Sequence, residues 1–359
     1  MKQSFHGYYK PTDEEFNAIW NEAIIVLDAN FLLNLYTYSM MTSQEILALL
    51  GEFDERLWVP HQVALEYQEN RHGIILKESK QYTDIAKSLE TVGMALRARK
   101  RHPYITSELA AKYEELETEI KKELKEGEGK YRELITADSI CEKITELFDG
   151  KVGPPMTEEV LERIYKDGET RYDKKIPPGF SDAQKPSPDK YGDLILWYQL
   201  IEHAKTSKRP VILVTDDLKR DWWAFTGDRR IGPRPELRHE FKSKTGYSIY
   251  IYSSDAFIEI AKDRGKNLSE SAAEEIENAS KERQQDAAKK RKLSQLTRDP
   301  LEKLREQERL MEQLTRDPLE KLREQERLLE QLAQDPLEKL REQERLMEQL
   351  TRDPLEKLR

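Results

Sequence analysis

Two short apolar runs, AIIVL at 23–27 and VILV at 211–214, constrain the fold of this chain more than any other feature. Both are rich in β-branched residues and flanked by polar residues, as is typical of strands buried in a parallel sheet. The run YSIYIY at 247–252 and the stretch around Trp58 predict two more strands. Helical patterns alternate with these strands, at 43–50, from His61 onward, at 190–205, at 236–244 and at 254–261. This alternation predicts an α/β fold with a central parallel sheet, which we expect to occupy residues 1–265.

A long charged stretch at about 73–150 interrupts the alternation. Its composition predicts a helical insertion, with turns at 102–104 and 126–130. Insertions of this kind often cap or clamp a site in the α/β core. The alternative is a solvated helical hairpin that does not contact a substrate.

The C-terminal part is an internal repeat of 18 residues, in which a proline recurs at positions 300, 318, 336 and 354. Eighteen residues make five helical turns, so successive units would present the same amphipathic face. We expect a helical connector at 266–292 and an all-α repeat tail at 293–359. The tail would serve for homo-oligomerisation or for docking a protein partner, unless it is only a spacer made by tandem duplication.

Composition excludes several classes of protein. The chain of 359 residues has one cysteine and six scattered histidines, so a metal would need oxygen ligands. No apolar run approaches the roughly 18 residues of a membrane span, and the first residues lack the apolar core of a signal peptide. We therefore expect a soluble, cytoplasmic protein. Its net charge of −9 means that contact with a nucleic acid needs a local basic patch or bound cations.

Acidic residues follow both of the strongest strand candidates. Asp28 comes directly after the first run, and Asp216 and Asp217 come after the second. Ligands of open α/β sheets bind outside the carboxyl ends of the strands, where these acids would lie. Asp193 heads the helix at 190–205, and Glu66 lies in the helix from His61. Each acid alone is more typical of a helix end or a solvated surface, but a cluster of three or four carboxylates suits Mg²⁺ or Mn²⁺.

Four strings in this order resemble the PIN-like nuclease domains, and among them the large bacterial PIN-like group: LDANFLLNLY, RLWVPHQVALEYQENR, IPPGFSDAQKPSPDKYGDLILW and VTDDLKRDWW. The resemblance covers roughly residues 20–260. It implies a three-layer α/β domain in which an acidic cluster binds one or two divalent cations, Mg²⁺ or Mn²⁺. It also implies hydrolysis of phosphodiester bonds, more often in RNA than in DNA, and the role of a bacterial stress, toxin or phage-defence effector.

The resemblance also implies roles for individual residues. The catalytic and metal-binding acids would be Asp28, Glu66, Asp193 and Asp216, with Asp217 as a neighbour or alternate. Asn30 and Thr215 would position water or the acids. Asp182 could support a second metal ion, although an acid in a loop rich in Pro and Gly is more typical of a turn.

Basic residues near these strings predict a nucleic-acid groove, formed by Arg71, Lys190, Lys219, Arg220, Arg230 and Arg234. Such residues neutralise phosphates, and Trp222 and Trp223 could stack on unpaired bases. The two tryptophans are at least as typical of core anchors.

Other classes fit less well. A receiver domain would need an acidic pair before the first helix, a dehalogenase-type phosphatase would need Asp in place of Asn30, and no glycine-rich phosphate loop is present. The main alternative to a nuclease is a catalytically inactive scaffold that acts through its helical repeats.

Overall fold

The structure is a computed structural model, and it describes residues 1, 5–97, 105–227, 229–290 and 345. It forms one compact unit from Met1 to Ala287, and a second unit begins at Ala288. The repeat tail at 293–359 and the expected turn at 102–104 lie outside the described residues, apart from residue 345. Everything below concerns the first unit.

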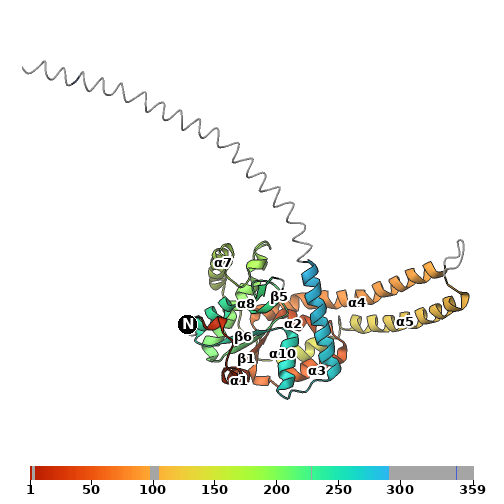
Figure 1. Cartoon of the computed structure of the whole chain (residues 1–359), viewed down its shortest axis with the longest axis horizontal. Helices are drawn as coiled ribbons and strands as arrows, with labels where there is room; N and C mark the ends of the chain where they lie inside the picture. Colours follow the sequence, from red (N-terminus) through yellow and green to blue (C-terminus); the bar gives the residue numbers. More distant parts are fainter. Residues whose placement is uncertain (2–4, 98–104, 228, 291–344, 346–359) are drawn as a thin grey trace, which may run out of the picture. The chain divides into compact units, whose positions relative to one another are not determined.

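A four-stranded parallel sheet forms the centre of this unit (Figure 1). Its order is β2 (Leu57–Trp58), β1 (Ile24–Leu27), β3 (Val211–Val214) and β6 (Ile249–Tyr252). Every residue of β1 and β3 is buried, which in a parallel sheet means that helices cover both faces. The predicted α/β class and its central parallel sheet are confirmed.

The described helices include those predicted at 43–50, 190–205, 236–244 and 254–261, with bounds that differ by up to three residues, and several that were not predicted. They are α1 (Asp13–Glu22), α2 (Ala29–Asn34), α3 (Met40–Gly51), α4 (His61–Arg97), α5 (Ser107–Glu133), α6 (Ser139–Leu147), α7 (Glu158–Asp173), α8 (Gly192–Ser207), α9 (Pro235–Thr245) and α10 (Ser254–Asp263). Strands β4 (Trp223–Thr226) and β5 (Arg229–Pro233) form a separate antiparallel hairpin between β3 and α9. Trp222 and Trp223 are buried, so the packing interpretation of these two residues is the one that the fold supports.

The insertion is a pair of long helices, α4 and α5, that lie side by side (Figure 1). The predicted turn at 126–130 is wrong, because α5 continues through it. A Cβ atom on Gly127 would stand 2.4 Å from the Tyr82 ring, so the glycine allows the two helices to pack closely and does not form a turn. Further along, Glu117 of α5 forms an ion pair with Arg97 of α4 and another with Lys121 of its own helix.

The segment expected to be a connector packs on the domain. Residues 270–287 are helical, and Ile276 is buried in the main core. Glu275 accepts hydrogen bonds from the backbone and hydroxyl of Ser39 and from the hydroxyl of Thr42, at 2.5 to 2.8 Å. The compact unit therefore extends past residue 265. None of the helices described could cross a membrane, since none is both long and apolar enough.

Candidate metal centre

A polar cavity of about 480 Å³ lies at the carboxyl ends of β1 and β3. Its lining includes seven carboxylates and two lysines: Asp28, Glu66, Glu69, Asp182, Asp189, Asp193, Asp217, Lys185 and Lys219. The fold thus gathers five of the six predicted acids, which come from four separate parts of the chain. We call this space the acidic cavity.

Helix α4 contributes three side chains to the acidic cavity besides the predicted Glu66. Gln62, Glu69 and Asn70 line it together with Glu66. These three residues stand four before, three after and four after Glu66, which places all of them on one face of the helix. This helical spacing from Glu66 is the sequence pattern from which the three residues could have been predicted.

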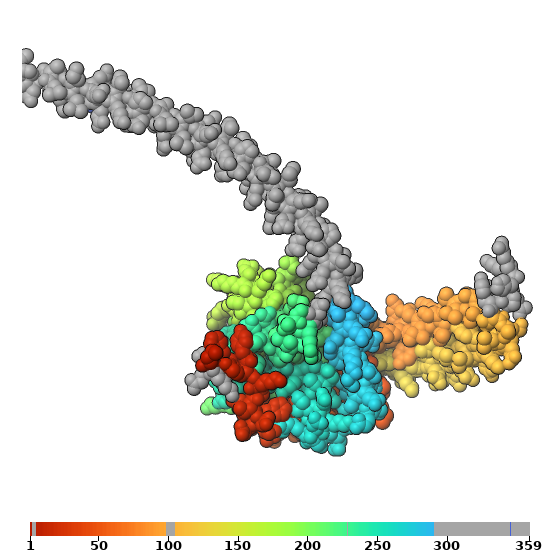
Figure 2. All heavy atoms as spheres, viewed as in Figure 1, coloured from red at the N-terminus to blue at the C-terminus, as the bar shows by residue number. Residues whose placement is uncertain are grey.

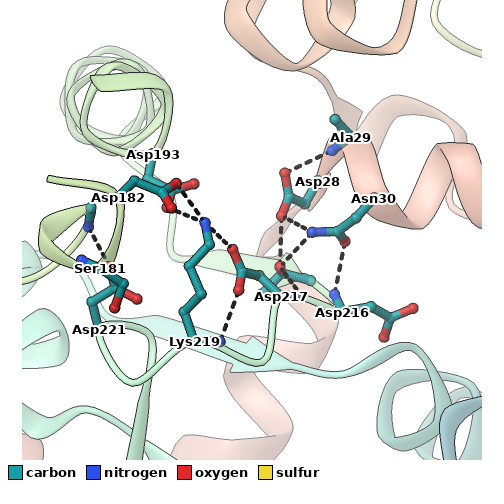
Figure 3. Close-up of polar contacts among 12 residues, drawn as sticks. Asp28, Ala29, Asn30, Ser181, Asp182, Asp193, Asp216, Asp217, Lys219 and Asp221 are labelled. Carbon is teal, nitrogen blue, oxygen red and sulfur yellow. Dashed lines mark hydrogen bonds and ion pairs between the residues drawn. The ribbon is translucent and has the colours of Figure 1, made fainter. Parts of the chain in front are cut away.

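Asp28 is held by three donors because it follows β1 and caps α2. Its Oδ1 accepts a hydrogen bond from the backbone N–H of Ala29 at 2.7 Å. Its Oδ2 accepts from Nδ2 of Asn30 and from the hydroxyl of Thr215, each at 2.6 Å (Figure 3). The two residues predicted to position the acids therefore both contact Asp28, whose carboxylate is fixed at the mouth of the β1–β3 pair.

The pKa of Asp28 reflects its burial first and repulsion from neighbouring acids second. Burial raises its pKa to about 7, and repulsion from Glu66, Asp193 and Asp217 adds to the effect, whereas the Thr215 hydrogen bond opposes it. Burial also raises the pKa of Asp217 to about 6, with repulsion from Asp193 as the next cause. Negative charge in the acidic cavity is thus unfavourable unless a cation balances it.

The burial of Asp28, together with repulsion from its neighbours, predicts that the metal-free protein loses stability as the pH rises. The pKa of Asp28 is raised from 3.8 to about 7 on folding. Between these values the folded chain retains a proton that the unfolded chain has lost, so the favourable contribution is present below about pH 4 and is lost by about pH 7. For one group the upper limit is about 4 kcal/mol. Urea denaturation in chelator from pH 5 to 8 should show this decline, and Asp28→Asn should flatten it; equal slopes for the two proteins would contradict the assignment.

The ammonium group of Lys219 lies between three of the acids. It lies 2.7 Å from Asp217, 2.9 Å from Asp182 and 3.0 Å from Asp193 (Figure 3). Burial disfavours the charge of Lys219, but Asp193 and Asp217 hold its pKa above the ordinary value. Burial likewise raises the pKa of Asp182, yet hydrogen bonds from Lys219 and Lys185 lower it overall. The ammonium group of Lys219 therefore partly balances the negative charge of three of the seven carboxylates that line the acidic cavity.

Asp216 lies outside the acidic cavity, unlike its neighbour Asp217. The Asp216 carboxylate accepts from the backbone and hydroxyl of Ser254, from Asn34 and from Arg283, at 2.5 to 3.2 Å. Adjacent residues at the end of an extended strand point to opposite sides, so only one of the pair can face Asp28. The acid that the structure brings to Asp28 and Asp193 is Asp217.

A tight loop positions Asp182. Gly179 has a φ of 93°, and the backbone N–H groups of Gly179 and Ser181 donate to the buried Asp221 at 3.0 and 2.9 Å. Asp221 was not singled out from the sequence, where nothing distinguishes it from a surface acid. It fixes the loop that delivers Asp182 to Lys219.

We expect Gly179→Ala to destabilise the protein by about 3 kcal/mol. An added Cβ would stand 2.3 Å from the Tyr172 hydroxyl, in a backbone conformation that itself costs a non-glycine residue about 1 kcal/mol. Gly265→Ala is a matched control, because Gly265 has a φ of 83° but nothing within 4 Å of its Cβ position. Equal losses in chemical denaturation would show that the contact with Tyr172 has no effect.

The six predicted nucleic-acid residues have other partners in the structure, and only Lys219 lines the acidic cavity. Arg71 pairs with Asp138 and Lys190 with Glu169, both at 2.8 Å. Arg220 lies 5.3 Å from the centre of the Phe225 ring, and Arg230 lies 4.4 Å from that of Trp223. Arg234 pairs with Glu236 at 2.8 Å. These contacts resemble structural supports more than a rim of unpaired cations.

The donor atoms of the acidic cavity suit Mg²⁺ or Mn²⁺, because they are carboxylate and amide oxygens and its described lining contains neither His nor Cys. As the side chains stand, no group of three or more His, Cys, Asp or Glu within the described ranges is arranged to hold a metal ion. The position of Lys219 accounts for this, because three of the acids turn toward its ammonium. An ion bound by these acids would have to replace that ammonium or lie beside it.

The carboxylates thus gather at the carboxyl ends of the central parallel strands, which is where α/β domains with open sheets usually bind their ligands. Residues 24–237 match the family model for the PIN-like domain, and the chain belongs to that family. PIN-like domains are generally metal-dependent nucleases and typically use Mg²⁺ or Mn²⁺. Neither a curated protein nor a solved structure was found to match the chain.

Proposed function

We propose that this protein is a divalent-metal-dependent nuclease that hydrolyses phosphodiester bonds, with RNA as its preferred substrate. One observation supports this most strongly: the buried Asp28 stands at the end of β1 in a cavity with Glu66, Asp193 and Asp217. The preference for RNA rests on the family resemblance.

The residues that we propose hold Mg²⁺ or Mn²⁺ are Asp28, Glu66, Asp193 and Asp217, with Asp182 as a further ligand if two ions bind. Such an ion would lower the pKa of a bound water molecule and neutralise charge on the phosphoryl group. The choice of Asp217 in place of Asp216 follows from the hydrogen bonds that turn Asp216 toward Ser254 and Arg283.

The chain's own groups prepare the site for an anionic substrate. Ala29, Asn30 and Thr215 orient the Asp28 carboxylate, so no rearrangement of that side chain is needed when substrate arrives. Lys185 and Lys219 supply the positive charges of the acidic cavity and can contact phosphate oxygens.

The test is to incubate the full chain with end-labelled structured RNA, unstructured RNA, single-stranded DNA and duplex DNA, with Mn²⁺, with Mg²⁺ and with chelator. We expect cleavage that requires metal and is faster on RNA, with product ends that sequencing can locate. Binding without cleavage would support the inactive scaffold, and cleavage that survives chelation would contradict metal dependence.

For the tail at 293–359 we propose a role in self-assembly or partner docking, supported by the amphipathic 18-residue repeat. The proposed setting, a cytoplasmic stress, toxin or phage-defence effector, rests on the family resemblance. If deletion of 293–359 leaves the mass measured by light scattering and the set of bound partners unchanged, the assembly role is wrong.

A further inference from the structure

A second cavity, of about 390 Å³, lies at the amino-terminal ends of strands β3 and β6. Pro210, which precedes β3, and Ser248, which precedes β6, both line it. Since the strands are parallel, their amino-terminal ends lie opposite the carboxyl ends where the acidic cavity is found. The two cavities are therefore separated by the sheet.

The charge of this second cavity has the opposite sign from that of the chain as a whole. Five cationic side chains line it, against the two acids Glu15 and Glu22: they are Lys10, Lys208, Arg209, Arg238 and Lys242. Glu15 is engaged in capping α1 through the N–H of Thr12. The side-chain ammonium groups of the three lysines, at 10, 208 and 242, form no hydrogen bond or ion pair with any residue that the structure describes. We call this space the basic cavity.

The wall of the basic cavity is held in place by the N-terminal segment. Arg238 donates to the carbonyl oxygens of Gly7 and Tyr9 at 2.8 and 3.2 Å. A Cβ atom on Gly7 would stand 2.3 Å from the carbonyl oxygen of Pro235, so the segment packs tightly on the start of α9. Figure 2 shows this red segment lying against the green and teal surface. Lys10, next to Tyr9, is thereby held at the cavity.

Lys208 adds a backbone observation. It ends α8 in the left-handed conformation, with φ 56° and ψ 37°. Glycine is the residue usually found at such a helix end, because a side chain is disfavoured there. Lys208 adopts this disfavoured conformation and adds its positive charge to a cavity that is already positively charged. This combination indicates that the Lys208 side chain has a functional role, such as binding an anion.

We propose that the basic cavity binds a nucleoside phosphate, either as a free nucleotide or as the phosphorylated end of a nucleic acid. The unpaired ammonium groups suit phosphate oxygens, and Tyr9 and Tyr247, which also line the cavity, suit stacking on a base. The volume is in the range of small-ligand sites. This inference does not depend on the proposed nuclease function.

The test is isothermal titration calorimetry of the full chain in chelator, so that no metal-assisted binding at the acidic cavity contributes. The probes are ATP, adenosine, and a five-residue oligoadenylate with and without a 5′-phosphate. We expect ATP to bind at least about tenfold more tightly than adenosine. A preference for the phosphorylated oligonucleotide would identify a nucleic-acid end as the source, and binding of ATP alone would identify a free nucleotide. No binding of any phosphorylated probe at millimolar concentration would overturn the proposal.

Three variants test whether ATP binds in the basic cavity. The double variant Lys208→Glu with Lys242→Glu should weaken ATP binding by about tenfold or more, whereas Lys166→Glu with Lys174→Glu, two exposed lysines of the α7 region, should change it less than about twofold. If both double variants weaken ATP binding equally, the effect comes from the overall charge of the protein and not from the basic cavity. Lys208→Gly keeps the backbone conformation that glycine prefers, so it should retain stability and still bind ATP more weakly; unchanged affinity in this variant would contradict the role of Lys208.

Discussion

Asp217→Asn is expected to slow phosphodiester cleavage by about 10³-fold, whereas Asp216→Asn should slow it by less than about tenfold. Asp217 lines the acidic cavity and its pKa is raised to about 6 by burial and then by Asp193. Asp216 instead binds Ser254, Asn34 and Arg283. Single-turnover cleavage at saturating Mn²⁺ measures both variants.

A second readout separates the two adjacent acids. Asp216→Asn should lower the free energy of unfolding, because it breaks the ion pair with Arg283 at 3.2 Å and leaves that guanidinium without its carboxylate. Asp217→Asn should lower the free energy of unfolding of the metal-free protein less. The substitution breaks the ion pair with Lys219 but also removes the repulsion between Asp217 and Asp193. The reverse order in activity, with Asp216→Asn the slower variant, would contradict the assignment of Asp217 to the site.

Lys219→Met is expected to destabilise the metal-free protein by about 2–4 kcal/mol at neutral pH. The substitution leaves Asp182, Asp193 and Asp217 without the cation that contacts all three, and a buried charge that loses its partner is costly. The lower part of this range allows for the 31% exposure of the Lys219 side chain. Chemical denaturation in chelator measures the loss, and Mn²⁺ should restore more stability to this variant than to the wild type.

Lys185→Met is the matched control for Lys219→Met. Lys185 also lines the acidic cavity, but it pairs with Asp182 alone and its side chain is 53% exposed. We expect its loss to cost less than about 1 kcal/mol. If the two variants lose equal stability, the three-fold contact of Lys219 does not hold the acids together.

The sequence was sufficient to predict the central sheet and the position of Asp28. An apolar run that is buried on both faces has few other interpretations, and an acid directly after it must lie at the carboxyl edge of the sheet. Glu66 and Asp193 also line the same cavity, as the prediction of one acidic cluster requires. Local pattern predicted the sheet and the place of Asp28, whereas the place of Glu66 and Asp193 beside it was implied by the resemblance to the PIN-like family.

The sequence could not distinguish Asp216 from Asp217, because the choice depends on distant partners. Ser254 and Arg283 hold Asp216, and they lie 38 and 67 residues further along the chain. The predicted basic groove had the same weakness, since Arg71 and Lys190 are paired with Asp138 and Glu169 far from them in sequence. Gly127 lies within α5 and not in the predicted turn, because the lack of a side chain there allows α5 to pack closely against Tyr82.

The most direct test of the account is metal-dependent cleavage by wild type and by Asp28→Asn, measured with the same labelled RNA and a Mn²⁺ titration. The account predicts that the variant remains folded, becomes more stable than wild type near pH 8 in chelator, and loses cleavage by about 10³-fold or more at every Mn²⁺ concentration. Undiminished cleavage by a folded Asp28→Asn protein would contradict the claim that the acidic cavity is the site of hydrolysis.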